Sequence, residues 1–150
     1  MPSYAFNGLS YTLHFFLGPV EPRVPYQQQP NLVGSVYTFT APFTTSRGGT
    51  GCSNCRAQAE ENVLSHSQIP LTRSVPIEER QDPDKAMEYF QRELRWVAVF
   101  DTGAKIPSRT LPALDITLLL GKNQLEGGLK GLPKFGEYQP KEFDWRSAEL

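Results

Sequence analysis

The chain has 150 residues, of which 39% are hydrophobic and 21% are charged, and only two are cysteine and two histidine. This length fits one domain with a sizeable core, and the hydrophobic content is too high for a disordered chain. The net charge of −1 argues against nonspecific electrostatic binding to nucleic acid. No apolar run approaches the ~20 residues that a membrane span needs. Two histidines are too few for a multi-histidine metal enzyme.

Charged and aromatic residues are distributed unevenly along the chain. The first 50 residues contain three of the 31 charged groups but nine of the 17 aromatic side chains. Two buried strands would account for part of this aromatic surplus. The rest could face a partner, because the centres of protein interfaces are rich in aromatic residues and poor in charge. Both interpretations stay open at this point.

Alternation of apolar and polar residues predicts strands at 10–17 and 32–40. His14 lies opposite the apolar face of the first strand, which indicates a half-buried strand residue and not a metal ligand. Gly34 in the second strand predicts a β-bulge or the close approach of another segment. The proline-rich run 22–30 predicts a long loop between the two strands. Further candidate strands, rich in β-branched or aromatic residues, are 62–68, 95–101 and 113–120.

One short helix is predicted at about residues 83–94. Asp82 is a suitable N-cap and Pro83 suits the first helical position. Apolar side chains then recur on one face at helical spacing, at Ala86, Met87, Phe90 and Leu94. The order of strands, helix and strands predicts a mainly-β fold, an antiparallel β-sandwich of about six to seven strands, and disfavours alternating βαβ units.

Glycine and proline become frequent after residue 120. We therefore predict a β-sandwich domain at 1–120 and a Gly/Pro-rich, partly ordered C-terminal tail at 121–150. Apolar residues of the tail, including Phe143 and Trp145, could dock parts of it on the domain.

Cys52 and Cys55 form a Cys-x-x-Cys motif after the glycine-rich run 48–51, which predicts a loop. Two thiols at this spacing can chelate one soft ion, close a small disulfide or exchange disulfides. A four-cysteine zinc site would need a second pair, and a thioredoxin-type site would need a helix opening at the motif within a βαβ unit, which the sequence does not indicate. Among metals, Cu(I) suits the pair, because two thiolates are enough for near-linear coordination.

Two further residues are candidates for a functional site. His66 falls on the predicted strand 62–68 and is either a solvated side chain or a third, transient metal ligand near the cysteines. Phe43 lies nine residues before Cys52, among threonine and proline. It either packs back on its own core or projects as an anchor into a pocket of a partner.

Several segments together resemble the C-terminal domain of fungal tyrosinases, and the pro-tyrosinases of filamentous moulds in particular. They are Leu13 to Gly18, Asn31 to Tyr37, the cysteine pair, and Leu94 to Trp96, and the resemblance covers roughly Tyr4 to Gly121. Tyrosinases are type-3 dicopper oxidases of monophenols and o-diphenols, and their catalytic domain is a four-helix bundle that holds two copper ions through six histidines. This chain, with two histidines, does not resemble that catalytic domain.

The resemblance implies a non-catalytic, removable domain that covers the dicopper site and keeps the pro-enzyme latent until proteolysis. Phe43 matches the aromatic residue with which the family blocks the phenol site. Cys52 and Cys55 match a Cys-x-x-Cys pair that the family uses in loading copper. The expected partners are the tyrosinase catalytic domain and copper ions, without nucleic acid or membrane. The start of the chain shows no basic region of a secretory signal, and the expected location is the fungal cytoplasm.

Three other functions are compatible with the residues alone. The chain could be a free-standing Cu(I) chaperone, a small redox protein that uses Cys52 and Cys55 as a dithiol, or a carbohydrate- or protein-binding sandwich whose cysteines are structural.

Overall fold

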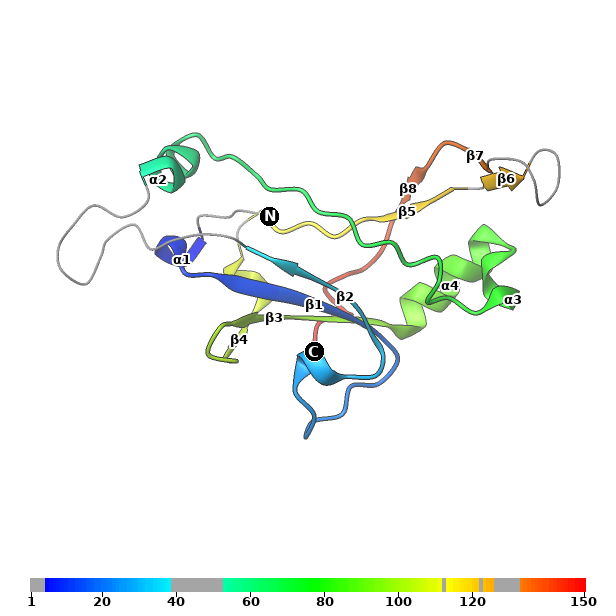
Figure 1. The fold of residues 1–150 in the computed structure, drawn as a ribbon, viewed down its shortest axis with the longest axis horizontal. Helices are drawn as coiled ribbons and strands as arrows, with labels where there is room; N and C mark the ends of the chain where they lie inside the picture. Colours follow the sequence, from blue (N-terminus) through cyan, green and yellow to red (C-terminus); the bar gives the residue numbers. More distant parts are fainter. Residues whose placement is uncertain (1–4, 39–52, 112, 122, 126–132) are drawn as a thin grey trace.

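The computed structural model describes residues 5–38, 53–111, 113–121, 123–125 and 133–150 (Figure 1). The α-helices are α1 (Ala5–Gly8), α2 (Ser53–Glu60), α3 (Ile77–Arg80) and α4 (Pro83–Glu93), and single 3-10 turns are η1 (Tyr26–Gln28) and η2 (Ser108–Thr110). The strands are β1 (Tyr11–Leu17), β2 (Leu32–Tyr37), β3 (Leu94–Phe100), β4 (Lys105–Ile106), β5 (Leu118–Leu120), β6 (Asn123–Leu125), β7 (Pro133–Phe135) and β8 (Gln139–Lys141). The predicted mainly-β class is confirmed.

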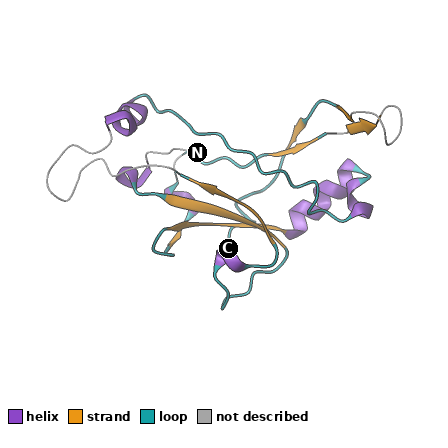
Figure 2. Cartoon of the chain, viewed as in Figure 1, coloured by secondary structure: helices purple, strands orange, loops and turns teal. Residues whose placement is uncertain are grey.

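A four-stranded antiparallel sheet is the centre of the fold, with strand order β2-β1-β3-β4 (Figure 2). β1 and β3 pair along their whole length, from Tyr11 opposite Phe100 to Leu17 opposite Leu94. The remaining described strands form the two-stranded ribbons β5–β8 and β6–β7. The strands predicted at 10–17, 32–40 and 95–101 are thus confirmed, with single-residue shifts at the ends of the first and third, while residues 39–40 lie outside the described residues.

The largest core lies on one face of the sheet. Side chains of β1, β3 and β4 pack there against two other parts of the chain, the segment after η2 and the C-terminal residues. The buried members of this core are Tyr11, Leu13, Phe15, Trp96, Ala98, Ile106, Leu111, Leu114, Trp145 and Ala148. The opposite face buries Phe16, Val97 and Val99 under the loop that joins β1 to β2. Because both faces are covered, the two central strands are buried along most of their length, and not on alternate residues as one-sided strands are.

The C-terminal residues complete the far edge of β3. The backbone N–H of Trp96 donates to the carbonyl of Ala148 (3.1 Å), and the N–H of Leu150 donates to the carbonyl of Trp96 (3.0 Å). The indole Nε1 of Trp96 donates to the carbonyl of Trp145 (2.6 Å), and the two rings lie 5.7 Å apart. The carboxylate of Glu149 accepts hydrogen bonds from the backbone N–H and the hydroxyl of Ser108. The expected docking of Phe143 and Trp145 is confirmed, while the division at residue 120 stays a prediction.

Both alternatives predicted for Gly34 are confirmed. Phe15 lies opposite Gly34 but Phe16 lies opposite Leu32, so that the register shifts by one residue as in a β-bulge. A Cβ atom on Gly34 would lie 2.5 Å from Cγ2 of Ile69, far inside van der Waals contact. Glycine therefore allows the segment that contains Ile69 to cross closely over β2.

The predicted helix is confirmed as α4, and its first turn is capped as expected. The side chain of Asp82 accepts a hydrogen bond from the backbone N–H of Asp84 (2.9 Å), and Pro83 occupies the first helical position. Ala86 and Phe90 are buried, and Phe90 packs with Leu94 in a smaller core cluster.

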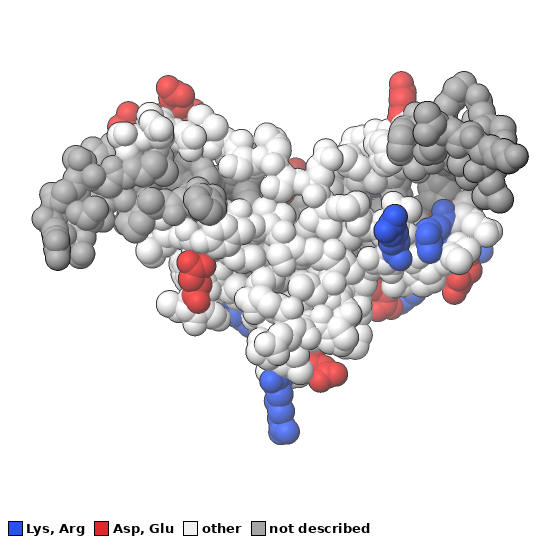
Figure 3. Space-filling view, viewed as in Figure 1, with Lys and Arg blue, Asp and Glu red and all other residues white. Residues whose placement is uncertain are grey.

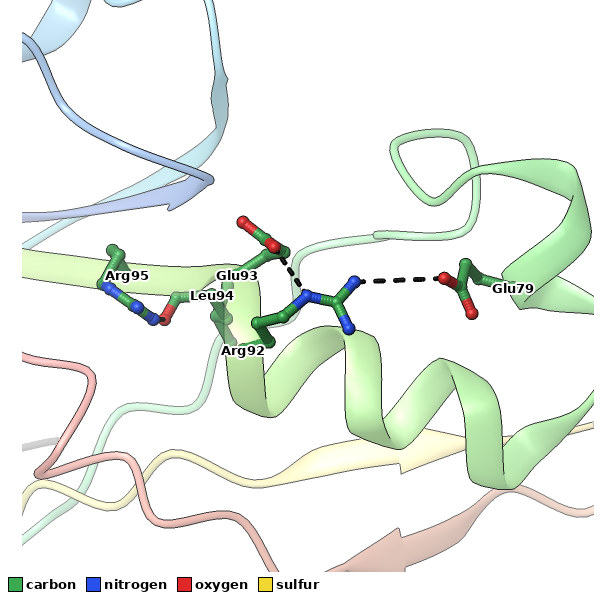
Figure 4. A network of polar contacts seen from close by, with 5 residues as sticks. All are labelled: Glu79, Arg92, Glu93, Leu94 and Arg95. Carbon is green, nitrogen blue, oxygen red and sulfur yellow. Dashed lines mark hydrogen bonds and ion pairs between the residues drawn. The ribbon is translucent and has the colours of Figure 1, made fainter.

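Charged side chains link α4 to the preceding helix α3 (Figure 4). Nε of Arg92 donates to Oε1 of Glu93 (2.8 Å), and an Nη atom of Arg92 lies 3.9 Å from Oε1 of Glu79. The guanidinium of Arg92 also lies over the ring of Tyr89, 5.5 Å from its centroid. Since the side chain of Arg92 is 59% exposed, solvent screens these interactions and they contribute little to stability.

One prediction from β propensity is wrong and another holds only in part. The segment 62–68 is extended, with a single β-bridge residue at Leu64, and forms no strand, and only 118–120 of the segment predicted at 113–120 is a strand, β5. β propensity measures how well a side chain fits a pleated, half-buried surface, and pairing also needs a free sheet edge. Ile69 lies on the face of β2, where no backbone ladder can form.

Two further features of the fold depart from the sequence prediction. A sandwich of about six to seven strands was predicted, and the described strands form one four-stranded sheet and two two-stranded ribbons; α1, α2 and α3 join the single expected helix. In the described ranges, no helix is long and apolar enough to cross a membrane.

Candidate functional site

The chain leaves the sheet at Thr38, directly after β2, and Thr38 is fixed there by three hydrogen bonds to Tyr11. The backbone N–H of Tyr11 donates to Oγ1 of Thr38 (2.8 Å), and Oγ1 donates in turn to the carbonyl of Tyr11 (2.9 Å). The backbone N–H of Thr38 donates to the same carbonyl (2.9 Å). Both residues are buried, and burial raises the pKa of the Tyr11 phenol to about 12. No pattern in the sequence distinguishes Thr38 from other threonines as this anchor.

Phe43 and Cys52 lie outside the described residues, and their predicted roles stay predictions. Phe43 follows the anchored Thr38 by five residues. An extended chain spans at most about 3.6 Å per residue, so Phe43 can lie no more than roughly 18 Å from Thr38.

The cysteine motif stands at the beginning of α2, contrary to the expectation that it does not open a helix. α2 begins at Ser53, directly after Cys52, and Cys55 is its third residue. Residues 53–60 include Arg, Gln, Glu and two Ala, which are strong helix formers. Their helix propensity explains why α2 forms where the glycine-rich run before the cysteines had suggested a loop. A βαβ unit around α2 is not formed by the described elements.

α2 ends in a Schellman motif that turns the chain away from the helix. The N–H of Val63 donates to the carbonyl of Gln58 (2.9 Å), and the N–H of Asn62 donates to the carbonyl of Ala59 (3.2 Å). Asn62 has φ 53°, in the left-handed region that asparagine tolerates. In Figure 1, α2 stands apart from the four-stranded sheet, and most of its described side chains are exposed.

His66 is exposed on the extended segment after α2, and the strand predicted around it is absent. Among the residues that the structure describes, no three His, Cys, Asp or Glu side chains are grouped to hold a metal ion. That finding does not include Cys52 or the side chain of Cys55. The role of His66 as a third metal ligand therefore stays a prediction.

His14 is more deeply buried than the sequence predicted, with 2% of its surface exposed. Its Nδ1 lies 2.7 Å from Oγ of Ser35, and its Nε2 lies 3.4 Å from Nε2 of Gln27. Its ring stacks on that of Tyr26, and burial lowers its pKa. Since both ring nitrogens face protein groups, His14 is a buried structural residue of the sheet, and the expectation that it binds no metal stays a prediction.

Comparison with known protein families gives one match. Residues 1–118 match the family described as the tyrosinase C-terminal domain. A search of curated proteins and a search of solved structures gave no match. The matched region contains the four-stranded sheet, α2 and α4, and the resemblance seen in the sequence is confirmed at the level of the family. The chain therefore belongs to the tyrosinase C-terminal domain family, whose partner is a tyrosinase catalytic domain.

Proposed function

We propose that this chain is the non-catalytic shielding domain of a tyrosinase. It covers the dicopper site of the catalytic domain and keeps the pro-enzyme latent until proteolysis separates the two domains. In this proposal Phe43 supplies the aromatic ring that occupies the phenol site. The family match of residues 1–118 carries the proposal, and the anchored Thr38 supports the part assigned to Phe43.

The physical requirements of such a plug are modest. An aromatic ring in the phenol site excludes water and competes directly with substrate. A covalent tether raises the effective concentration of the plug to about millimolar for a short linker, so that weak contacts are enough. Cleavage of the tether removes this advantage. The plug still needs a rigid origin, and the buried bonds between Thr38 and Tyr11 supply one five residues before Phe43.

The test is Phe43→Ala in the uncleaved pro-enzyme, assayed for oxidation of a monophenol. We expect activity without cleavage and an unchanged unfolding midpoint. Tyr138→Ala is the matched control, since Tyr138 is an aromatic side chain that is 50% exposed on another part of the chain. The control should stay latent. A Phe43→Ala pro-enzyme that stays as latent as its parent would exclude the blocking role.

We also propose that Cys52 and Cys55 bind Cu(I) as cargo and pass it to the histidines of the catalytic domain, with His66 as a candidate third ligand. The start of α2 at Ser53 supports this proposal. A spacing of three residues is typical of cysteine pairs whose two thiolates bind one soft ion. The helix N-terminus favours the negative charge of thiolates, and thiolates prefer soft Cu(I).

An anaerobic titration with Cu(I) against a competing chelator tests the copper role. We expect one tight equivalent that is lost in Cys52→Ser/Cys55→Ser. Ser53→Ala/Asn54→Ala is the matched control, because it changes the two residues between the cysteines and keeps both thiols. His66→Gln should weaken binding if His66 is the third ligand. Equal binding by the double cysteine variant and the parent would remove the copper role.

The helical start of α2 also favours a second candidate function, a dithiol redox module. A Cys-x-x-Cys motif at a helix N-terminus lowers the cost of forming a thiolate, and a reducing compartment such as the cytoplasm keeps such thiols free. This alternative predicts disulfide reductase activity that disappears in Cys52→Ser. A free-standing Cu(I) chaperone predicts copper binding without inhibition of a tyrosinase.

A further inference from the structure

Three aromatic rings pack together at one end of the four-stranded sheet. The ring of Phe6, in α1, meets the ring of Tyr11 edge to face at 5.8 Å and the ring of Phe100 in the same way at 5.1 Å. Tyr11 begins β1 and Phe100 ends β3, and the two residues lie opposite each other in the sheet. These contacts hold α1 at the end of the sheet where β1 begins (Figure 1).

The backbone of Phe6 indicates that this packing is specific. Phe6 has φ 58°, in the left-handed region that residues other than glycine rarely adopt. Such a conformation persists where the surrounding structure requires it, and the side chain of Phe6 is partly buried against the main core. Residues 5–8 contain no charged group, so no ion pair holds α1. Most of the charged side chains visible in Figure 3 likewise lie toward the margins of the molecule.

Tyr11 is also the residue that holds the origin of the segment with Phe43. Its backbone makes two hydrogen bonds with Oγ1 of Thr38 and one with the N–H of Thr38, at 2.8–2.9 Å. Phe43 follows Thr38 by five residues. One buried residue therefore contacts α1 through its ring and the origin of the proposed plug through its backbone.

The tether of the proposed pro-enzyme reaches the domain at α1. A C-terminal domain follows its catalytic domain in the chain, so the tether comes before α1 in the sequence. If α1 left the sheet, residues 5–10 would join the tether and lengthen it by up to about 20 Å. A longer and looser tether lowers the effective concentration of the plug at the phenol site.

We infer that Phe6 is a positioning residue for the plug. It packs α1 on Tyr11, which keeps the tether short and supports the hydrogen bonds that fix Thr38. Phe6 thus acts on Phe43 through Tyr11 and Thr38. The inference rests on the proposed function, because the plug and the tether belong to that proposal.

The test is Phe6→Ala in the uncleaved pro-enzyme. Phe143→Ala is the matched control, since Phe143 is also a phenylalanine that is partly buried against the main core. Phe6→Tyr is the conservative variant, because it keeps the ring. The rate of oxidation of a monophenol is measured before and after complete cleavage of the tether. The ratio of the two rates, here called the leak, corrects for differences in the amount of active enzyme.

We expect Phe6→Ala to raise the leak at least about fivefold, because the plug loses its fixed origin and its short tether. Phe143→Ala and Phe6→Tyr should stay within about twofold of the parent. The unfolding midpoints of both alanine variants should fall, so a leak in only one of them is not a general effect of lost stability. If Phe6→Ala does not fold, Phe6→Leu takes its place, since leucine keeps an apolar side chain but has no ring.

Hydrogen exchange of the uncleaved pro-enzyme, measured by mass spectrometry, tests the hold on Thr38 without an activity assay. The backbone N–H groups of Tyr11 and Thr38 both donate within the bonded pair. Exchange in peptides that contain these groups should be at least about tenfold faster in Phe6→Ala than in the parent. In Phe143→Ala it should be unchanged.

The outcomes separate this inference from the proposed function. If Phe6→Ala leaks no more than Phe143→Ala, or exchanges as slowly as the parent, the inference is overturned, while activation by Phe43→Ala would still support the plug. A Phe6→Tyr variant that leaks as much as Phe6→Ala would also overturn it, since the ring contacts would then not matter. If Phe43→Ala stays latent, the plug is excluded and the inference falls with it, whatever Phe6→Ala does.

Discussion

The side chain of Ile69 lies directly on the backbone of Gly34, so that a Cβ atom on the glycine would be 2.5 Å from Cγ2 of the isoleucine. Ile69 packs there against the main core, on the face of β2 that carries Gly34. Next to Gly34 the register between β1 and β2 shifts by one residue, as in a β-bulge. A glycine in a strand, often a weakness, is here the condition for a layer over the sheet.

Gly34→Ala should lower the free energy of unfolding by about 1–3 kcal/mol, since the added methyl group overlaps the side chain of Ile69, which must shift within its packing against the core. Urea denaturation measures this change. In the double variant Gly34→Ala/Ile69→Ala the overlap is removed, and the loss should be smaller than the sum of the two single losses. Strictly additive losses would show that contact with Ile69 is not the reason why alanine is unfavourable at position 34.

Thr38→Val should destabilise the domain by about 1–3 kcal/mol, because valine keeps the shape of threonine but leaves the buried N–H of Tyr11 without its acceptor. Thr110→Val is the matched control, since Oγ1 of Thr110 donates to Pro107 in an exposed turn. The control should change stability by less than about 0.5 kcal/mol. Equal losses in both variants would contradict the anchoring role of Thr38.

Trp145→Ala should be among the most damaging single substitutions, with a loss of about 3–5 kcal/mol. The indole of Trp145 is 7% exposed, and it packs in the main core beside Trp96. Tyr138→Ala, an exposed aromatic in the same C-terminal region, serves as the control and should have little effect. A small effect of Trp145→Ala would mean that residues after the family match add little to the fold.

The stability of the domain should rise with pH around the ordinary pKa of histidine because of His14. Burial lowers the pKa of His14 from its ordinary value of 6.5, and its neighbours Ser35, Gln27 and Tyr26 carry no charge that would stabilise an imidazolium. The unfolded chain therefore binds a proton more readily than the folded one. The contribution of His14 is fully present above pH 6.5 and is lost as the pH falls below it.

Urea midpoints measured between about pH 5 and pH 8 test this prediction, with His14→Gln as the comparison. The variant should lose the part of the pH dependence that lies around the ordinary histidine pKa. A parent chain and a His14→Gln variant with parallel pH profiles would assign the dependence to other groups.

Strands and the helix with strong local signals could be predicted from the sequence. Alternation at 10–17 identified β1, and the N-cap Asp82 with Pro83 identified α4. Both signals come from residues close together in the sequence, so they do not depend on the rest of the fold. The same reasoning failed at 62–68, where β-branched and apolar residues suggested a strand. Whether that segment pairs or crosses over a face depends on what lies beside it, and Gly34 on another strand decides this.

The candidate site was likewise predicted from the sequence in part and missed in part. The Cys-x-x-Cys motif, Phe43 and the family resemblance were visible in the sequence, since residue identity and spacing carry them. The helix at Ser53, which places the motif at a helix N-terminus, was missed because no apolar face marks α2.

By itself the sequence determined the family, the mainly-β class and the residues whose chemistry suggests a plug and a copper pair. Only the tertiary structure decided that Ile69 lies on Gly34, that Thr38 is tied to Tyr11, and that the C-terminal residues complete the main core. Local patterns report what each segment prefers, whereas contacts between distant segments depend on how a whole chain buries its apolar surface at once.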